Sequence, residues 1–370
     1  MHLPFCRSKC HYCDFNSYAG LDSLFPGYVD ALARELAWAA PLVEGRKVAT
    51  VYVGGGTPTL LGPGPLGRLL KMVRDHLRLA PGAEITVEAN PGTVAAGDFP
   101  ALLEAGYNRI SFGVQSFRPG LLRRLGRIHS PEEAREAVAG ARAEGFPNVS
   151  LDLIYGLPGQ DLSVWRRDLE EAVGLQPQHI SAYGLQVEAG TSFYRWWQRG
   201  ELVLPDEETE EAMFDLTREY LGQAGYEAYE ISSFARPGFR CRHNELYWRN
   251  GEYVGVGAGA ASYLKGSRET NLGDPSAYVE AVQAGLSPRA EFDRLDGKGT
   301  MAETVILALR TADGLSAKGF LNRFGVRVQD EYGGTLEGLQ GQGLVEWQGD
   351  SLRLTPRGLK LGNVVFRAFL

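Results

Sequence analysis

Three cysteines stand close together near the start of the chain, in the pattern Cys6-x-x-x-Cys10-x-x-Cys13. Three thiolates on one short loop can ligate three irons of a [4Fe–4S] cubane and leave the fourth iron without a protein ligand. A structural zinc ion is the alternative. Zinc takes four closed ligands, and only Cys241 and scattered histidines could complete the set. The spacing therefore predicts a [4Fe–4S] cluster on these three cysteines.

Small and acidic residues at the ends of apolar runs are further candidates for ligand contacts. Gly54, Gly55 and Gly56 follow the apolar run 48–53, and glycines let the backbone approach a ligand and offer its N–H and C=O groups. A tight turn without function is the alternative. Asp152 stands inside the apolar run 149–155, where a buried carboxylate is costly unless it has hydrogen-bond donors.

Alternating strand and helix patterns must position these residues. Short apolar runs at 48–53, 84–88, 109–112, 149–153 and 179–185 are separated by stretches of helical period at 28–40, 65–77, 131–144 and 162–175. This order predicts an α/β fold of five or six βα units with a mostly parallel sheet, open or closed into a partial barrel. The chemistry of such sheets gathers at the carboxyl ends of the strands.

The pattern changes after about residue 288. Helices are expected near 302–312, 316–324 and 328–341, followed by two short strands at 345–347 and 352–354 and a last helix that opens at Pro356. This order is typical of a winged-helix-like module. We therefore expect two domains, 1–290 with the barrel and a linking segment, and 291–370 with the winged helix.

Composition and charge exclude several classes of function. The net charge is −7, so no basic field is available for a phosphate backbone, and nucleic acid is not expected as a partner even though winged helices often bind DNA. No apolar run approaches the roughly 20 residues of a membrane helix. The N-terminus lacks the features of a secretory signal, and four cysteines of which three crowd together suit a reducing compartment. We expect a cytoplasmic protein that is not integral to a membrane.

The motifs together resemble a known family. The cysteine loop followed by Gly54-Gly55-Gly56-Thr57-Pro58-Thr59 is similar to the radical SAM superfamily, whose members use the cluster to cleave S-adenosylmethionine (SAM). The match narrows to the oxygen-independent coproporphyrinogen III oxidase-like family, through segments that begin at His2, Glu88, Gly113, Asp152 and Gly255. The resemblance covers essentially the whole chain and implies a partial (β/α)6-type radical SAM barrel. Because the family has Tyr and a β-branched residue before His-Leu-Pro-Phe-Cys, a few native residues are expected upstream of Met1.

The resemblance implies a set of SAM contacts. Backbone groups of Gly54, Gly55 and Gly56, with Thr57 beside them, would meet the amino-acid part of SAM, and Glu88 its ammonium group or ribose hydroxyls. Gln115 and Asp152 resemble the ribose contacts of the family. Arg127 resembles the arginine that holds the SAM carboxylate in a charge-assisted fork. Alone, Arg127 would pass as a surface charge and Glu88 as a solvated strand end.

Two branches of the family remain open. In the oxidase the third motif cysteine is followed by Gly and another Cys and an N-terminal extension is present, whereas here Asp14-Phe15 follows and five residues precede Cys6. The segment from Cys241 to Trp248 resembles the His-Asn-x-x-Tyr-Trp motif of the heme-chaperone branch. His243 or Cys241 could ligate heme iron and Tyr247 and Trp248 could flank the porphyrin. A buried polar cluster that braces the loop before Tyr253 is the alternative.

The resemblance therefore implies a heme chaperone that binds heme, a [4Fe–4S] cluster and SAM. It would deliver heme to acceptor proteins such as membrane-bound respiratory enzymes. An active oxygen-independent coproporphyrinogen III oxidase is the second hypothesis, and a nucleic-acid regulator the third. The sequence leaves open whether SAM is cleaved, whether the protein is an enzyme, and whether it forms a homodimer. The segment 255–259 is interpreted as a glycine-rich stretch packed near the second ligand rather than a dinucleotide site.

Overall fold

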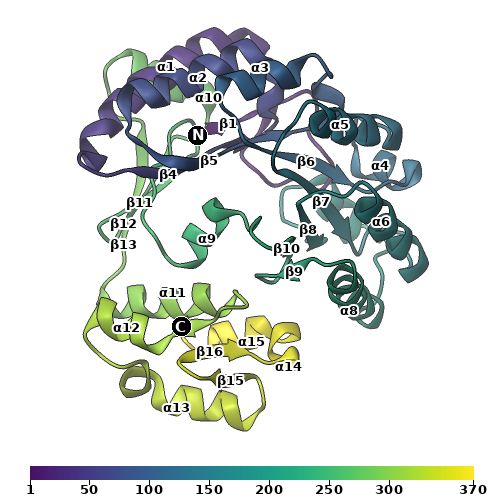
Figure 1. The fold of residues 1–370 in the computed structure, drawn as a ribbon, viewed down its shortest axis with the longest axis vertical. Coiled ribbons are helices and arrows are strands. Elements are labelled where there is room, and N and C mark those ends of the chain that lie inside the picture. Colours follow the sequence, from purple (N-terminus) through teal and green to yellow (C-terminus); the bar gives the residue numbers. More distant parts are fainter.

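A computed structural model describes residues 1–370, and its largest element is an eight-stranded sheet. The six strands from β1 to β8 in the sheet run parallel, and two short antiparallel strands close its far edge. In spatial order the strands are β1 (His2–Leu3), β4 (Val48–Gly55), β5 (Leu79–Ala89), β6 (Arg109–Gln115), β7 (Val149–Tyr155), β8 (His179–Gly184), β10 (Ser233–Ala235) and β9 (Glu227–Ala228). Because β1 and β9 do not pair, the barrel is partial, as expected (Figure 1).

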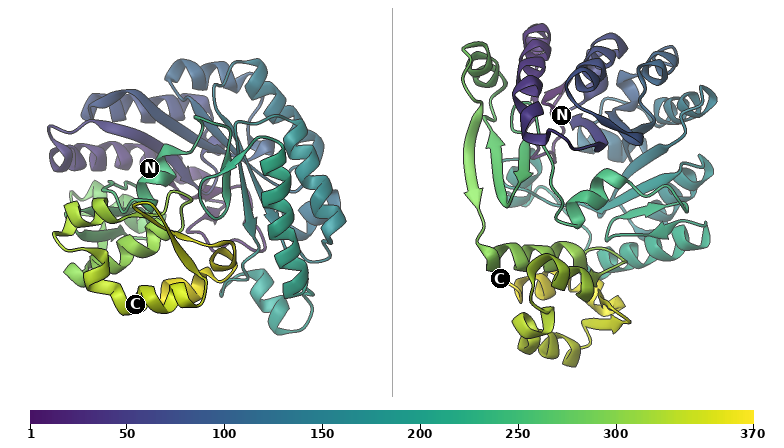
Figure 2. Two further views of the ribbon diagram at one scale, coloured as in Figure 1. Left: turned by 60° about the horizontal axis from the view of Figure 1, so that its bottom comes forward. Right: turned by 60° about the vertical axis from the view of Figure 1, so that its left-hand side comes forward.

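Helices cover the outer face of this sheet, as the views in Figure 2 show. They are α1 (Phe25–Ala39), α2 (Pro63–His76), α3 (Asp98–Ala105), α4 (Pro119–Leu125), α5 (Pro131–Ala143), α6 (Leu162–Gly174) and α8 (Glu207–Gln223). Several begin at side-chain caps. Ser130 and Glu133 form a complete capping box at α5, and Asp161 and Asp206 accept backbone N–H groups at the starts of α6 and α8. Four short 3-10 helices, η1 (Asp22–Leu24), η2 (Ala40–Val43), η3 (Pro58–Leu61) and η4 (Pro91–Thr93), lie in the connections.

Alternation along the strands separates an apolar outer face from a polar inner face. On β6, Ile110 and Phe112 belong to the main hydrophobic core against the helices. The residues that alternate with them, Arg109 and Ser111, point the other way and are also buried. Successive side chains of a strand point to opposite faces, so the same rule places Ser150 and Asp152 of β7 on the inner side. The inner face of the barrel is therefore polar, which is unusual for a small closed barrel filled with branched residues.

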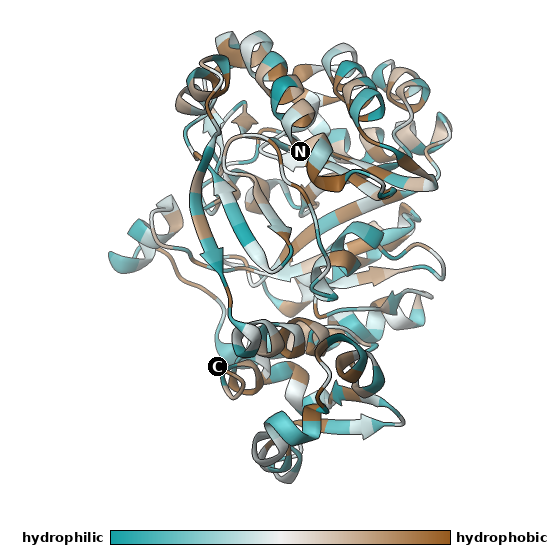
Figure 3. Ribbon diagram, turned by 90° about the vertical axis from the view of Figure 1, so that its left-hand side faces the viewer, coloured by the Kyte–Doolittle hydropathy of each residue, from teal (hydrophilic) through white to brown (hydrophobic).

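A second, smaller sheet leads from the barrel to the C-terminal part. It contains β11 (Ala261–Leu264), β12 (Ser267–Asn271) and β13 (Arg289–Arg294). Strands β12 and β13 are largely hydrophilic (Figure 3), and β13 is exposed along nearly its whole length. Its charged residues protect an edge that could otherwise pair with another chain. The elements before α11 that have not yet been named are the pair β2 (Phe5–Cys6) and β3 (Tyr18–Ala19) and the helices α7 (Ser192–Gln198), α9 (Arg242–Trp248) and α10 (Pro275–Gln283).

The C-terminal residues have a hydrophobic core of their own. The order of elements is that of a winged helix, with a three-stranded sheet in the order β14-β16-β15. The elements are α11 (Gly297–Leu309), β14 (Leu315–Ser316), α12 (Ala317–Phe324), α13 (Val328–Gly341), β15 (Val345–Gln348), β16 (Ser351–Leu354), α14 (Pro356–Lys360) and α15 (Gly362–Arg367). No helix of the chain combines the length and the apolar character that crossing a bilayer requires.

Candidate functional site

The cysteine loop runs between β2 and β3, which pair in parallel and hold its two ends together. Phe5 anchors it in the core, 1% exposed and packed edge-on against Tyr28. Inside the loop, the Lys9 ammonium donates to the backbone carbonyl of Ser17 (3.1 Å) and to its hydroxyl (3.0 Å). These contacts tie Lys9 in the middle of the loop to Ser17 near its end.

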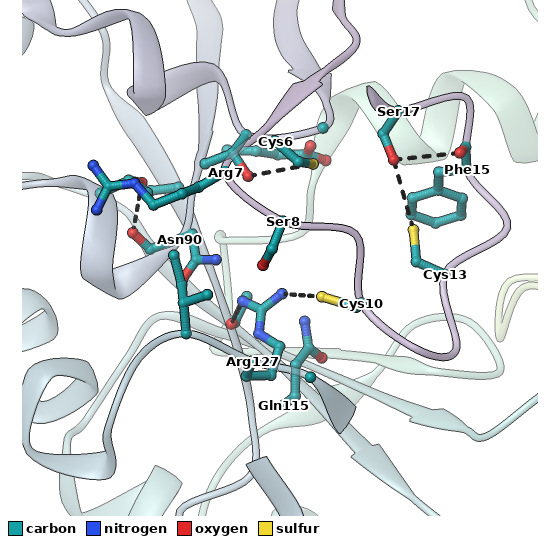
Figure 4. A pocket seen from close by; sticks show the side chains of 18 of the residues that line it. Cys6, Arg7, Ser8, Cys10, Cys13, Phe15, Ser17, Asn90, Gln115 and Arg127 are labelled. Atoms are coloured by element: carbon teal, nitrogen blue, oxygen red, sulfur yellow. Dashed lines mark hydrogen bonds between the residues drawn. The ribbon is translucent and has the colours of Figure 1, made fainter. Parts of the chain in front are cut away.

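All three loop cysteines are free, half-buried thiols that line one cavity (Figure 4). Each sulfur has a polar neighbour. The Thr57 hydroxyl lies 3.8 Å from Cys6 Sγ, Arg127 Nη1 3.5 Å from Cys10 Sγ, and the Ser17 hydroxyl 3.9 Å from Cys13 Sγ. Donors of this kind stabilise thiolates, the form that binds iron.

The donor set fits a cluster better than a single metal ion. Nowhere in the chain do three His, Cys, Asp or Glu side chains converge closely enough to hold one ion, and Cys241 lies away from this cavity. Zinc needs four convergent ligands, whereas a cubane takes one thiolate at each of three separate irons. Three thiols spread around one cavity wall match the second requirement.

The glycines at the end of β4 allow the strand to lie against the cysteine loop. A Cβ on Gly56 would overlap the Phe5 carbonyl and lie 2.9 Å from Cys6 Sγ, and one on Gly55 would lie 2.9 Å from the Leu3 carbonyl oxygen. Gly55 also has a φ of +124°, which favours glycine. Their role in the chain is close approach of two backbone segments.

The N–H groups of these glycines have partners within the chain, and the contact between this segment and SAM stays a prediction. The N–H groups of Gly54 and Gly56 donate to the carbonyls of Met1 (3.1 Å) and Leu3 (2.8 Å). The Gly55 N–H donates to the Glu88 carboxylate (3.0 Å). The pairing with β1 therefore accounts for the N–H groups of Gly54 and Gly56, and the Glu88 side chain for that of Gly55. Gly55, Gly56 and Thr57 line the cavity, and Gly54 does not.

Two carboxylates from the inner face of the sheet, Glu88 of β5 and Asp152 of β7, also line the cavity. Glu88 accepts hydrogen bonds from the Tyr52 hydroxyl (2.7 Å) and the Gly55 N–H, and Asp152 accepts one from the Ser111 hydroxyl (3.1 Å). Burial raises the pKa of both groups, and their hydrogen bonds oppose the rise.

Arg127 and Gln115 complete the wall opposite the cysteines. The Arg127 guanidinium donates to Cys10 and to the Gly113 carbonyl, while its buried Nε has no partner. A buried, incompletely paired guanidinium fits an anionic group such as a carboxylate. Gln115 has a φ of 67° at the point where the register between β6 and β7 shifts. Strained residues and β-bulges are often found at ligand-binding and active sites.

The structure adds residues that sequence reasoning missed. Tyr12, Asn90 and Ser111 line the same cavity, which encloses about 890 Å³ and is partly open to solvent. Ser111 could have been found from the inner-face alternation of β6. Nothing in the sequence distinguishes Tyr12 from a core tyrosine.

The segment from Cys241 to Trp248 lies apart from this cavity, at the amino ends of β4 and β5. It forms α9, and the Glu84 carboxylate accepts the N–H groups of Arg242 and His243, both at 3.0 Å. Cys241 is fully buried beside the same carboxylate, and burial raises the pKa of its thiol to about 11. The thiol is therefore neutral at ordinary pH.

His243 has partners on both ring nitrogens. Nδ1 lies 2.8 Å from the Thr50 hydroxyl and Nε2 2.8 Å from the Tyr247 hydroxyl, and the ring stacks on Tyr52 with a centroid distance of 4.9 Å. Burial lowers the pKa of His243 to about 3, so the imidazole is neutral. Trp248 faces α11, where the Arg310 guanidinium lies 5.0 Å from its ring centroid. The structure brings Cys241, His243 and Tyr247 together and turns Trp248 away.

A second cavity adjoins His243, between α1, β4 and α9. It has a volume of about 1490 Å³ including its solvent-open part, and its lining is mostly hydrophobic and includes Leu36, Val254 and Leu246. Met1 lies in its wall. The α-ammonium group of Met1 donates to the Tyr52 carbonyl (2.6 Å), and burial lowers the pKa of this amine to about 6.

The glycine-rich segment 255–259 packs against the first strand and the cysteine loop. A Cβ on Gly257 would overlap the His2 carbonyl, and one on Gly259 would overlap the Asn16 side chain. The Gly257 N–H donates to the buried Glu35 carboxylate (2.8 Å). Its glycines therefore permit close approach to β1, and a role beside a second ligand stays a prediction.

Comparisons with known proteins match both parts of the chain. Residues 1–172 match the radical SAM superfamily and residues 295–361 the HemN C-terminal domain. A protein named heme chaperone HemW from Mycobacterium tuberculosis is 42% identical over 373 residues, which cover 100% of this chain and 94% of that protein. One of the same name from Bacillus subtilis is 37% identical over 371 residues, covering 100% and 98%.

A solved structure has the same fold over the full length. Coproporphyrinogen III oxidase (HemN) from Escherichia coli, described as a radical SAM enzyme, superimposes with a TM-score of 0.87 at 24% identity. The match covers 100% of this chain and 88% of that one. At this identity the likeness establishes the fold and does not extend to the reaction.

Proposed function

Since the chain belongs to the radical SAM superfamily and, within its coproporphyrinogen III oxidase-like family, to the HemW proteins, we propose that it is a heme chaperone. The observation that carries the proposal is the full-length similarity to relatives that bear this name. The aspartate that follows Cys13, where the oxidase branch has Gly and Cys, supports the same choice. The chaperone would bind heme and pass it to acceptor proteins such as membrane-bound respiratory enzymes, in the cytoplasm, as a monomer or a homodimer.

We further propose that the first cavity holds a [4Fe–4S] cluster on Cys6, Cys10 and Cys13, with SAM beside it. The cluster would supply one-electron reducing chemistry when bound. The chain's own part is to hold and orient the ligands. Arg127, with a free buried Nε, would pair with the SAM carboxylate. Glu88 and Asp152 would accept hydrogen bonds from the ammonium group and the ribose hydroxyls, and Gln115 would contact the ribose.

For heme we propose the segment from Cys241 to Trp248 and the apolar cavity beside His243. The cavity supports the proposal because a porphyrin needs a large, mostly hydrophobic site with few polar groups. Iron ligation by His243 requires the loss of its hydrogen bond to Tyr247 or Thr50. Cys241 is the less suitable ligand, because its thiol is buried and neutral.

One anaerobic experiment separates the chaperone from the oxidase. The reconstituted protein is incubated with SAM, a reductant and coproporphyrinogen III, and in parallel is loaded with heme and mixed with a heme-free acceptor protein. We expect no protoporphyrinogen IX and a transfer of heme to the acceptor. Stoichiometric decarboxylation would instead establish the oxidase, and a heme-loaded protein that never releases heme would overturn the chaperone proposal.

A further inference from the structure

The inner face of the barrel carries a buried guanidinium that has no partner. Arg109, at the start of β6, is 2% exposed and makes neither an ion pair nor a side-chain hydrogen bond, and its Nε is buried without an acceptor. Leaving a charge buried and unpaired is costly unless the surrounding charges compensate it. The neighbours of Arg109 therefore indicate what its charge does.

The register of the sheet places Arg109 between carboxylates. Thr86 of β5 lies directly beside Arg109, so Glu84 and Glu88 stand two residues away on either side. On its own strand, Arg109 is two residues before Ser111, whose hydroxyl donates to Asp152 of β7. Glu88 pairs with Ser111 and Asp152 with Gly113, so Arg109 lies one layer of side chains below Glu88 and two layers below Asp152.

We propose that Arg109 is a positioning residue of the SAM site, whose charge keeps Glu88 and Asp152 ionised so that both can accept hydrogen bonds from SAM. The inference rests on the proposed SAM site. Arg109 does not line the cavity, so it acts through the two carboxylates rather than by touching SAM. A neutral carboxylic acid at either position would present a hydroxyl group to the ligand and lose the charge that an ammonium group attracts.

The electrostatics of the inner face support this role. Burial raises the pKa of Glu88 and of Asp152, and the positive charge of Arg109 lowers both. The other titratable groups around Arg109 are Tyr52, Glu84, His179, Tyr229, Cys241 and His243. Asp152 also faces Arg127, Tyr12 and Tyr183.

Most of these groups are neutral near pH 7. Burial lowers the pKa of His179 and of His243 and raises the pKa of Cys241 and of the tyrosines. The carboxylates therefore have two cations to balance them, and Arg127 is already engaged by Cys10. Arg127 thus serves both the carboxylates and the cysteine loop. Arg109 serves the carboxylates and makes no hydrogen bond to the loop.

The first test is the pH dependence of SAM affinity, measured by anaerobic calorimetry on the cluster-loaded protein and on Arg109→Gln and Arg109→Lys. Affinity should fall on the acid side, where Glu88 and Asp152 take up protons. Loss of the Arg109 charge should shift this fall in affinity to higher pH, by on the order of one pH unit. At a pH where the affinity is already falling, SAM binding should therefore be about tenfold weaker than in the wild type. Arg109→Lys should restore the wild-type profile. A role in packing alone would weaken binding equally at every pH.

The second test needs neither cluster nor SAM. Carboxyl 13C signals of Glu88 and Asp152 in the apoprotein are titrated, with the buried Asp168 of α6, which pairs with Arg118, as the control. In Arg109→Gln, Glu88 and Asp152 should titrate at higher pH, and the Asp168 signal should keep its wild-type titration. Unchanged titration of Glu88 and Asp152, or equal behaviour of the Lys and Gln variants, would overturn the inference. The variants Glu88→Gln and Asp152→Asn test the SAM site itself. If both bind SAM as tightly as the wild type, SAM does not bind beside these carboxylates, and the inference about Arg109 fails together with the proposed site.

Discussion

At the scale of single residues, the thiols of the cysteine loop decide whether a cluster forms. Each of Cys6, Cys10 and Cys13 would supply one thiolate, so none can be spared. We expect anaerobic reconstitution to give about four irons per chain, and Cys→Ala at any of the three positions to abolish this iron content. Cys241→Ala is the matched control, because it removes a thiol outside the cavity. Iron loss as complete in the control as in the others would refute the ligand assignment.

The two cavity carboxylates should matter for SAM and not for iron. Glu88→Gln and Asp152→Asn each remove a charge-assisted hydrogen bond, which costs about 1.5–3 kcal/mol, or roughly ten- to a hundred-fold in affinity. Anaerobic calorimetry measures the affinity and iron analysis the cluster. Glu84→Gln is the control, since Glu84 shares the strand face but contacts α9. Equal weakening by the control would indicate a general effect on the fold.

His129 gives the site a predictable response to acid. It is 4% exposed, and burial followed by the nearby Arg127 charge lowers its pKa from 6.5 to about 4. Because the unfolded state binds the proton first, its contribution is complete above pH 6.5 and is lost as the pH falls towards 4. The free energy of unfolding should fall by about 3 kcal/mol over that range through this group.

Denaturant unfolding at several pH values checks the prediction for His129. The variant His129→Gln should have a flatter pH dependence than the wild type. His76→Gln, at an exposed position on α2, should keep the wild-type slope. An unchanged slope in His129→Gln would assign the acid sensitivity to other groups.

Residue types and spacing predicted part of the site. The cysteine pattern, Glu88 and Asp152 could be singled out from the sequence, and the structure places all five around one cavity. The use of the glycine N–H groups could not be predicted, because it depends on the pairing of β4 with β1. Arg109 was missed because an arginine at the start of a strand looks like a surface charge.

At the scale of elements, the parallel strands were predictable and the antiparallel ones were not. The five expected strands are confirmed, since each combines an apolar outer face with turns on both sides. Strands β9 and β10 have two and three residues, too few for any alternation to stand out. The sheet of β11, β12 and β13 was missed because β12 and β13 are polar and β13 is exposed along nearly its whole length.

Helix α9 is the element on which the heme proposal depends. We expect His243→Ala to weaken heme binding most among the variants of this segment, because an imidazole is the usual neutral ligand of heme iron. Heme titration followed by the Soret band, in a Cys6→Ala background without the cluster, measures it. Tyr247→Phe, which frees the His243 Nε2, should keep or strengthen binding. If His243→Ala, Cys241→Ala and Tyr247→Ala all retain the parent affinity, α9 is a structural brace.

At the scale of the whole molecule, two hydrophobic cores are joined by polar contacts. Arg323 of α12 donates to the carbonyls of Arg249 (3.3 Å) and Asn250 (3.1 Å), and Lys360 lies 2.7 Å from Glu211 of α8. The C-terminal residues thus pack on α9 and α8 through charges and backbone groups (Figure 1). Element order predicted the winged helix, but the partner of each surface charge depends on the packing of distant segments and could not be predicted.

In a chain that begins at Met1, the buried amino group of this residue makes the folded molecule resistant to one kind of chemical label. An amine with a pKa of about 6 is mostly unprotonated near pH 7 and would react readily with an acylating reagent, yet it lies in the wall of a cavity and is held by the Tyr52 carbonyl. Near pH 7 we expect acylation of Met1 to be slow in the native protein and fast in denaturant, as peptide mass spectrometry would show. Rapid labelling of the native protein would mean that the first strand frays. The rate at which Met1 is acylated thus reports how often the edge of the barrel opens locally.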